Sequence, residues 1–71
     1  MTATSTPIER FGTLVKAQRQ HKGWSQHQLA DVADISRPTV ARIEAGSAVS
    51  TATLAKVAEA LGIEVSAEVN G

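Results

Sequence analysis

The chain has 71 residues, a formal net charge of zero and no cysteine. A chain this short buries only about 60% of its unfolded surface, so we expect one domain with a modest core and extra stability from pairing with another chain. Disulfides and thiolate metal sites are excluded, and no acidic cluster stands beside the two histidines, His21 and His27, so we expect no metal and no other cofactor.

The charges are unevenly distributed. Residues 1–46 carry six basic and four acidic side chains, a net charge of +2, whereas residues 47–71 carry one and three, a net charge of −2. No apolar run approaches the ~20 residues of a membrane span and no signal-peptide pattern is present, which predicts a cytoplasmic protein. There is no carboxylate pair at a useful spacing and no glycine-rich phosphate loop, so we do not expect an enzyme.

Residues 1–5 are small and polar, which predicts a flexible N-terminus. The first helix should begin after Thr6, because Thr6 can cap it and Glu9 can complete a capping box. It should run to about Lys22 and stop at Gly23. Gly12 lies inside this helix at a cost of ~1 kcal/mol relative to alanine, which indicates a close contact with another backbone.

Residues 26–44 read as two short helices joined by a tight turn. Ser25 begins a capping box for a helix from Gln26 to about Ala33, and Ser36 caps a helix that ends near Ala45. Each helix has its apolar residues on one face, and these residues are Leu29, Ala33, Val40 and Ile43. The short connection folds one helix across the other, as in a helix-turn-helix unit, and the second helix is then the candidate reader of DNA.

A fourth helix should run from the cap Ser50 to the stop Gly62. After it, apolar and polar residues alternate, which predicts a β-strand. The apolar positions of this strand are Ile63, Val65, Ala67 and Val69. A single strand cannot satisfy its own backbone groups, and no second strand is predicted, so we expect it to pair with the same strand of a second copy.

The predicted fold class is therefore all-α. Residues 6–62 should form a compact bundle of four to five helices that contains the helix-turn-helix, and residues 63–71 should form a dimerisation strand and tail. Leu14, on the first helix, and the fourth helix are the rival dimer surfaces.

Four motifs in order resemble the lambda-repressor-like, or Xre-type, helix-turn-helix family. They are F-G-x-x-V-K-x-x-R-x-x-x-G-W-S-Q over 11–26, x-x-L-A-x-x-A over 27–33, I-S-R-x-T-V-A-R-I-E-x-G over 35–46 and S-x-x-x-L-x-x-V-A-x-A-L-G-I over 50–63. The resemblance implies a bundle of four or five helices that binds double-stranded operator DNA as a homodimer.

Carried over residue by residue, the resemblance assigns two kinds of DNA contact. The base-reading positions correspond to Arg37, Pro38, Thr39 and Arg42, and the two arginines suit bidentate contacts to guanine. The phosphate-contacting positions correspond to Gln26, Gly46 and Ser47, with Lys16 and Lys22 as weaker candidates.

The resemblance also pairs Arg19 with Glu44 in a structural salt bridge, so neither should contact DNA. Two residues depart from the family pattern. Asp34 stands where the family usually has glycine, and Pro38 replaces a polar reading residue, which leaves base recognition to Arg37 and Arg42.

Within the family, the GWSQ segment, the compact fourth helix and the terminal strand are most similar to antitoxins of the HipB type. That similarity implies an autorepressor of a toxin–antitoxin operon, with a cognate toxin as a protein partner. A stand-alone repressor of the phage or restriction-controller kind, with no toxin partner, is the alternative.

Overall fold

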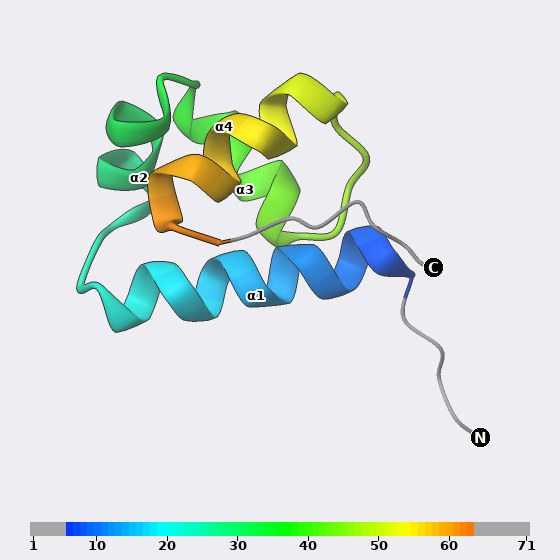
Figure 1. Cartoon of the computed structure of the whole chain (residues 1–71), viewed down its shortest axis with the longest axis horizontal. Helices are drawn as coiled ribbons and strands as arrows, with labels where there is room; N and C mark the ends of the chain where they lie inside the picture. Colours follow the sequence, from blue (N-terminus) through cyan, green and yellow to red (C-terminus); the bar gives the residue numbers. More distant parts are fainter. Residues whose placement is uncertain (1–5, 64–71) are drawn as a thin grey trace.

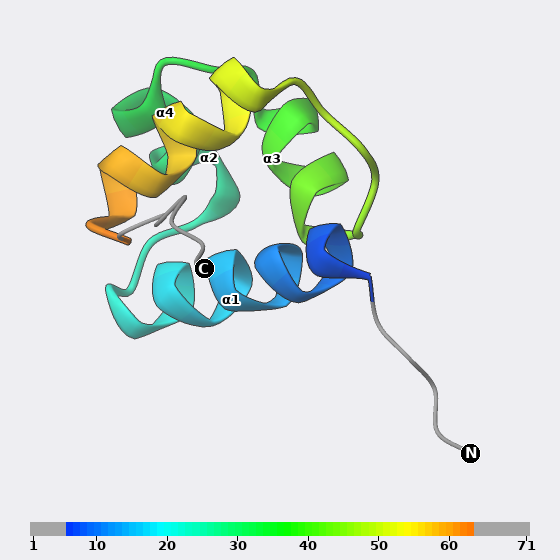
Figure 2. The same ribbon diagram turned by 45° about the vertical axis from the view of Figure 1, so that its right-hand side comes forward.

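The computed structural model describes residues 6–63, which fold into four α-helices and contain no β-strand. In chain order these are α1 (Pro7–His21), α2 (Gln26–Ala33), α3 (Arg37–Glu44) and α4 (Thr51–Leu61). The helix α1 runs along one side of the bundle, and α2, α3 and α4 lie on the other side of it (Figures 1 and 2).

Every helix begins at a hydroxyl residue that caps it. The side-chain oxygens of Thr6, Ser25, Ser36 and Ser50 each accept a hydrogen bond from the amide three residues on. In α1 and α2 the cap is reciprocal, because Glu9 and Gln28 accept from the cap amide in return. Each cap is worth about 1 kcal/mol, and the four predicted helix starts are confirmed.

The helix ends follow the predicted stop residues. Gly23, Gly46 and Gly62 all have positive φ, and the turn after α2 is made by Asp34 at φ 61°. Asp34 is the one non-glycine residue between 6 and 63 with positive φ. Aspartate adopts this conformation more readily than most residues, so the departure from glycine leaves the turn intact at a cost in stability.

The core forms where the four helices meet. Val15, Leu29, Val40, Ile43 and Val57 are at most 1% exposed and come from all four helices. Smaller residues of α2, mainly Ala30 and Ala33, fill the space where that helix crosses its neighbours. Around them Phe11, Trp24, Ile35 and Leu54 are half-buried, so Trp24 has the packing role expected of a lone tryptophan between helices.

The helix α1 packs directly on the backbone of α3 at Gly12. A Cβ added there would collide with the carbonyl oxygen of Ile43 and lie 3.2 Å from its carbonyl carbon. Gly46, just after α3, is also close to α1, since a Cβ on it would lie 2.9 Å from the Cγ of Glu9. The predicted close contact at Gly12 is confirmed, and its partner is the end of α3.

The predicted dimerisation strand lies mostly outside the described residues. Only Ile63 of that segment is described, and it is half-buried against the core after the cap of α4. Four helices, at the lower end of the predicted range, form the bundle over residues 6–63.

Replacing Gly12 with alanine should destabilise the fold. The added methyl group must push α1 away from α3. Because it meets a backbone carbonyl, we expect a cost near the upper end of the usual range for overpacking, about 3 kcal/mol, which outweighs the ~1 kcal/mol that alanine gains in helix propensity. Chemical denaturation of Gly12→Ala should give a lower free energy of unfolding. The matched control is Gln20→Ala, an exposed change in the same helix, which should leave the stability unchanged. Equal stability of all three proteins would contradict the close packing.

Candidate nucleic-acid interface

The helix α3 has one buried face and one exposed face. Val40 and Ile43 lie inside, whereas Arg37, Pro38 and Arg42 are exposed. Pro38 and Arg42 are four residues apart, so they lie one above the other at the centre of the exposed face. Arg37 precedes Pro38 by one residue, about 100° around the helix, so the two cations lie on either side of Pro38 on the exposed surface of this helix of eight residues.

Three of the predicted base-reading residues are thus exposed, whereas the fourth, Thr39, is half-buried and its hydroxyl is engaged. The hydroxyl of Thr39 lies 2.7 Å from the hydroxyl of Ser36, and its amide donates to the same oxygen. Thr39 is half-buried, so its methyl group is its remaining means of contact. Arg42 makes one long hydrogen bond, 3.5 Å, to the carbonyl of Ala48.

The predicted ion pair between Arg19 and Glu44 is present and nearly buried. Nε of Arg19 lies 2.6 Å from Oε2 of Glu44 and Nη2 lies 3.1 Å from Oε1, a bidentate pair whose side chains are 11% and 5% exposed. The hydrogen bond and the charge of Glu44 raise the pKa of Arg19, and burial opposes this rise without cancelling it. Nη1 of Arg19 also donates to the carbonyl of Trp24, so one guanidinium joins α1, the α1–α2 turn and α3.

Gln26 extends this pair to the reading face of α3. Its Nε2 donates to Oε1 of Glu44 at 3.1 Å, and its Oε1 accepts from Nη1 of Arg37 at 3.1 Å. Arg19, Glu44, Gln26 and Arg37 therefore form one continuous chain of hydrogen bonds, from the inside of the bundle to its surface. Both ends of the Gln26 side-chain amide are therefore used within the free protein, and its predicted contact with the DNA backbone stays a prediction.

The backbone amides of Gly46 and Ser47 are also used within the protein. The amide of Gly46 donates to the carbonyl of Ile43 at 3.0 Å, and that of Ser47 to the carbonyl of Arg42 at 2.9 Å. Together with the positive φ of Gly46, these bonds form a Schellman motif that ends α3. Both amides thus satisfy the last carbonyls of the helix in the free protein, and the predicted phosphate contacts at Gly46 and Ser47 stay predictions.

The two predicted phosphate lysines are both exposed but differ in their surroundings. Lys16 lies one turn after Gly12 and so near the edge of α1 that faces α3. The ammonium of Lys22 lies 5.3 Å from the centre of the Trp24 ring, a cation–π contact beside the start of α2.

Sequence reasoning missed the bonds of Gln26 to Glu44 and Arg37. These residues are 18 and 11 positions from Gln26, and no local periodicity relates them. The polarity of Gln26 gave no signal of these bonds, because His27 and Gln28 beside it are also polar and are exposed.

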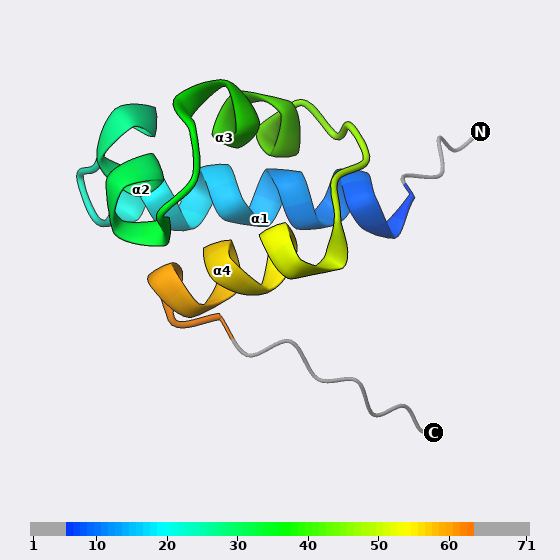
Figure 3. The same ribbon diagram turned by 90° about the horizontal axis from the view of Figure 1, so that it is seen from above.

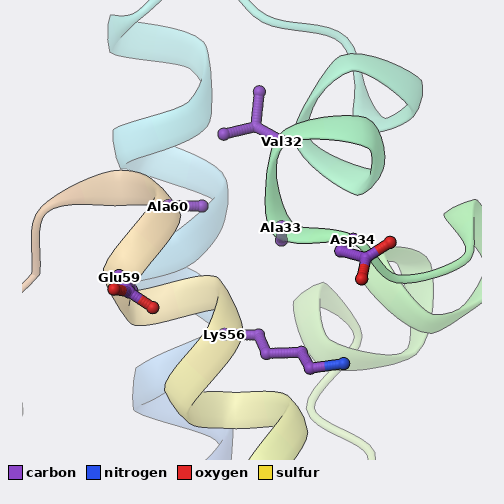
Figure 4. A pocket seen from close by; sticks show the side chains of 6 residues that line it. All are labelled: Val32, Ala33, Asp34, Lys56, Glu59 and Ala60. Atoms are coloured by element: carbon purple, nitrogen blue, oxygen red, sulfur yellow. The ribbon is translucent and has the colours of Figure 1, made fainter.

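A second feature, a groove between α2 and α4, mixes polar and apolar side chains (Figure 4). It is lined by Val32, Ala33, Asp34, Lys56, Glu59 and Ala60, and Val32 is 54% exposed. Over residues 6–63 no three histidine, cysteine or acidic side chains gather as metal ligands would. In the same part of the chain no helix has the length and hydropathy to span a membrane.

Comparison with known proteins agrees with this geometry. A family model described as helix-turn-helix matches residues 15–67, about three quarters of the chain. The chain matches no curated protein.

Removing Arg19 should destabilise the protein strongly. In Arg19→Ala the carboxylate of Glu44 keeps its burial but loses its charged partner, which costs about 3 kcal/mol for a pair of this kind. Thermal and chemical denaturation measure the loss, and Lys16→Ala, which removes one exposed cation from the same helix, is the matched control. If the two variants are equally stable, the pair does not hold α1 to α3.

Proposed function

Since the chain belongs to the Xre/lambda-repressor-like helix-turn-helix family, a family of DNA-binding regulators, we propose that it represses transcription by binding a specific double-stranded operator as a homodimer. The observation that carries this proposal is the exposed face of α3, where Arg37 and Arg42 flank Pro38 on the second helix of the helix-turn-helix. This surface has the size and charge of a major-groove reader, and we propose no catalytic role.

Within this proposal, Arg37 and Arg42 make the sequence-specific contacts. A guanidinium donates to O6 and N7 of guanine in a bidentate contact, which discriminates against the wrong base by about 1–3 kcal/mol. Pro38 lies between them and offers only an apolar surface, suited to a thymine methyl group. The methyl group of Thr39 suits the same kind of contact.

The phosphate contacts position the reader. We propose that Lys16 and Lys22, both exposed, neutralise phosphates on the two sides of α3, and that the first amides of α2 receive a phosphate beside Gln26. At the end of α3 the hydroxyl of Ser47 takes the place of the Gly46 and Ser47 amides, which are bonded internally.

Two features support the proposed homodimer: the short length of α3 and the alternating apolar and polar residues that follow α4 in the sequence. One helix of eight residues reads few base pairs, and two copies related by a two-fold axis read a palindrome with half-sites about 34 Å apart. We propose that the strand 63–69, with apolar positions Ile63, Val65, Ala67 and Val69, pairs with its copy to set this spacing.

We also propose that the repressor is the antitoxin of a toxin–antitoxin pair. The distribution of charge supports this role. Residues 47–71 carry a net charge of −2, whereas the half that contains α3 is basic, so the acidic half is available for a second, protein partner. A stand-alone repressor has no such partner. Co-expression with the product of the adjacent gene separates the two roles, because only an antitoxin relieves growth arrest by that product.

Arg42→Ala should weaken the preference for the operator while leaving the fold intact, because Arg42 is exposed and its one hydrogen bond within residues 6–63 is long. The ratio of operator to random-sequence binding, measured at a fixed salt concentration, should fall by roughly 10–100-fold. The control Lys56→Ala removes one exposed cation from α4 and should keep the ratio. An unchanged ratio in Arg42→Ala would refute the assignment of α3 as the reader.

A chain shortened after Gly62 should be monomeric at concentrations where the full chain is dimeric, since the paired strand is lost. Sedimentation equilibrium of the two proteins gives the comparison. Circular dichroism provides the control. The last of the four helices ends at Leu61, so the shortened chain should keep its helix content. A shortened chain that still dimerises with the same affinity would move the interface to Leu14 or α4.

A further inference from the structure

The side chain of Gln26 holds one of the two arginines on the exposed face of α3. The helix α3 begins beside α2 (Figure 3), and the first residues of the two helices, Gln26 and Arg37, are in contact. Nη1 of Arg37 donates to Oε1 of Gln26 at 3.1 Å. An exposed arginine on its flexible stem otherwise samples many rotamers, so this bond selects among the positions that the guanidinium can take.

Gln26 can hold Arg37 because its own amide is fixed in one orientation. Its Nε2 donates to Oε1 of Glu44 at 3.1 Å, and Glu44 is itself held by the bidentate pair with Arg19. A carboxylate only accepts hydrogen bonds and a guanidinium only donates them, so the amide nitrogen must face Glu44 and the amide oxygen must face Arg37. The half-buried Gln26 thus transmits the position of a nearly buried carboxylate to an exposed arginine.

The bond to Gln26 leaves one edge of the Arg37 guanidinium for a base. The bond uses Nη1, whereas Nε and Nη2 carry two parallel N–H bonds on the adjacent edge. Two parallel donors match O6 and N7 of guanine, and this is the contact that the proposed function assigns to Arg37. Gln26 and a guanine can therefore bind the same guanidinium at the same time.

The second arginine of α3, Arg42, is held by a different part of the structure. Arg42 is exposed and lies five residues after Arg37 on the same helix, and its guanidinium donates to the carbonyl of Ala48 at 3.5 Å. Arg37 is thus held by α2, and Arg42 by the loop that follows α3. A change at Gln26 should affect the first arginine and spare the second.

We propose that Gln26 is a positioning residue for base recognition, which holds Arg37 so that the Nε–Nη2 edge of its guanidinium meets guanine. Discrimination at the base pair that Arg37 reads then depends on Gln26, whereas discrimination at the base pair that Arg42 reads does not. This role rests on the proposed function, and it is separate from the predicted contact of Gln26 with the DNA backbone.

The test uses the full chain and an operator selected from random-sequence DNA, with each base pair of its half-site changed in turn. Arg37→Ala and Arg42→Ala assign one base pair to each arginine, as the base pair whose change no longer affects the dissociation constant. Gln26→Met keeps the length and bulk of the side chain and removes both hydrogen bonds of the amide. Gln20→Met makes the same change at an exposed position of α1 and is the matched control.

In Gln26→Met, discrimination at the Arg37 base pair should fall by at least about threefold, as expected for side chains that share one hydrogen-bond network. Discrimination at the Arg42 base pair should stay unchanged, and Gln26→Met should cause no further loss in Arg37→Ala. An unchanged Arg37 base pair would overturn the proposal, and so would an equal loss at both base pairs, because Gln26 would then only stabilise the helix-turn-helix. A parent protein that prefers no DNA sequence would instead refute the proposed function, and the role of Gln26 with it.

A second variant and a measurement without DNA keep the test valid if Gln26→Met is unstable. Gln26→Lys keeps a donor for Glu44 but places a cation beside Arg37, so it should show the same loss at the Arg37 base pair, while its added charge acts equally on all duplexes. In the free protein, ¹⁵N relaxation of the Arg37 Nε–H should show restricted motion in the parent and in Gln20→Met, and faster motion in both Gln26 variants. Equal motion of Arg37 in the parent and in the Gln26 variants would overturn the proposal.

Discussion

The bidentate pair between Arg19 and Glu44 is the interaction on which the arrangement of this bundle depends. The two side chains are only 11% and 5% exposed. Each charge needs the other, because one of them buried alone would have a desolvation cost that nothing offsets. Arg19 also donates to the carbonyl of Trp24. The pair therefore fixes three segments at once: the end of α1, the turn before α2 and the last residue of α3.

The same pair connects the interior with the surface that reads DNA in our proposal. Gln26 donates to Glu44 and accepts from Arg37, so the orientation of an exposed arginine is linked to a buried carboxylate. In the free protein this link restricts the rotamers of Arg37, which lowers the entropy that DNA binding must remove. Stability and recognition thus share one chain of hydrogen bonds, with Gln26 at its centre.

A net charge of zero is compatible with a DNA-binding surface because the four carboxylates of residues 1–46 are used elsewhere in the structure. Asp34 makes the turn after α2 and lines the α2–α4 groove. Glu44 is buried against Arg19, and Glu9 completes the cap of α1. Asp31 lies 3.7 Å from His27 on the outer face of α2. What remains exposed on α3 is positive, so the local field, and not the total charge, decides which partner that face attracts.

The sequence by itself determined the helices, because their signals are local. A hydroxyl cap, a glycine with positive φ and apolar residues three or four apart act within a few residues, and they placed all four helices to within a residue or two. The polar contacts between helices could not be predicted in this way. The Arg19–Glu44 pair was predicted only through resemblance to a family, and the bonds of Gln26 to Glu44 and Arg37 were not predicted at all. Whether the amides of Gly46 and Ser47 were free also depended on how α3 ends in space. Tertiary structure alone decided these points, because a side chain 18 residues away becomes a neighbour only when the helices have packed.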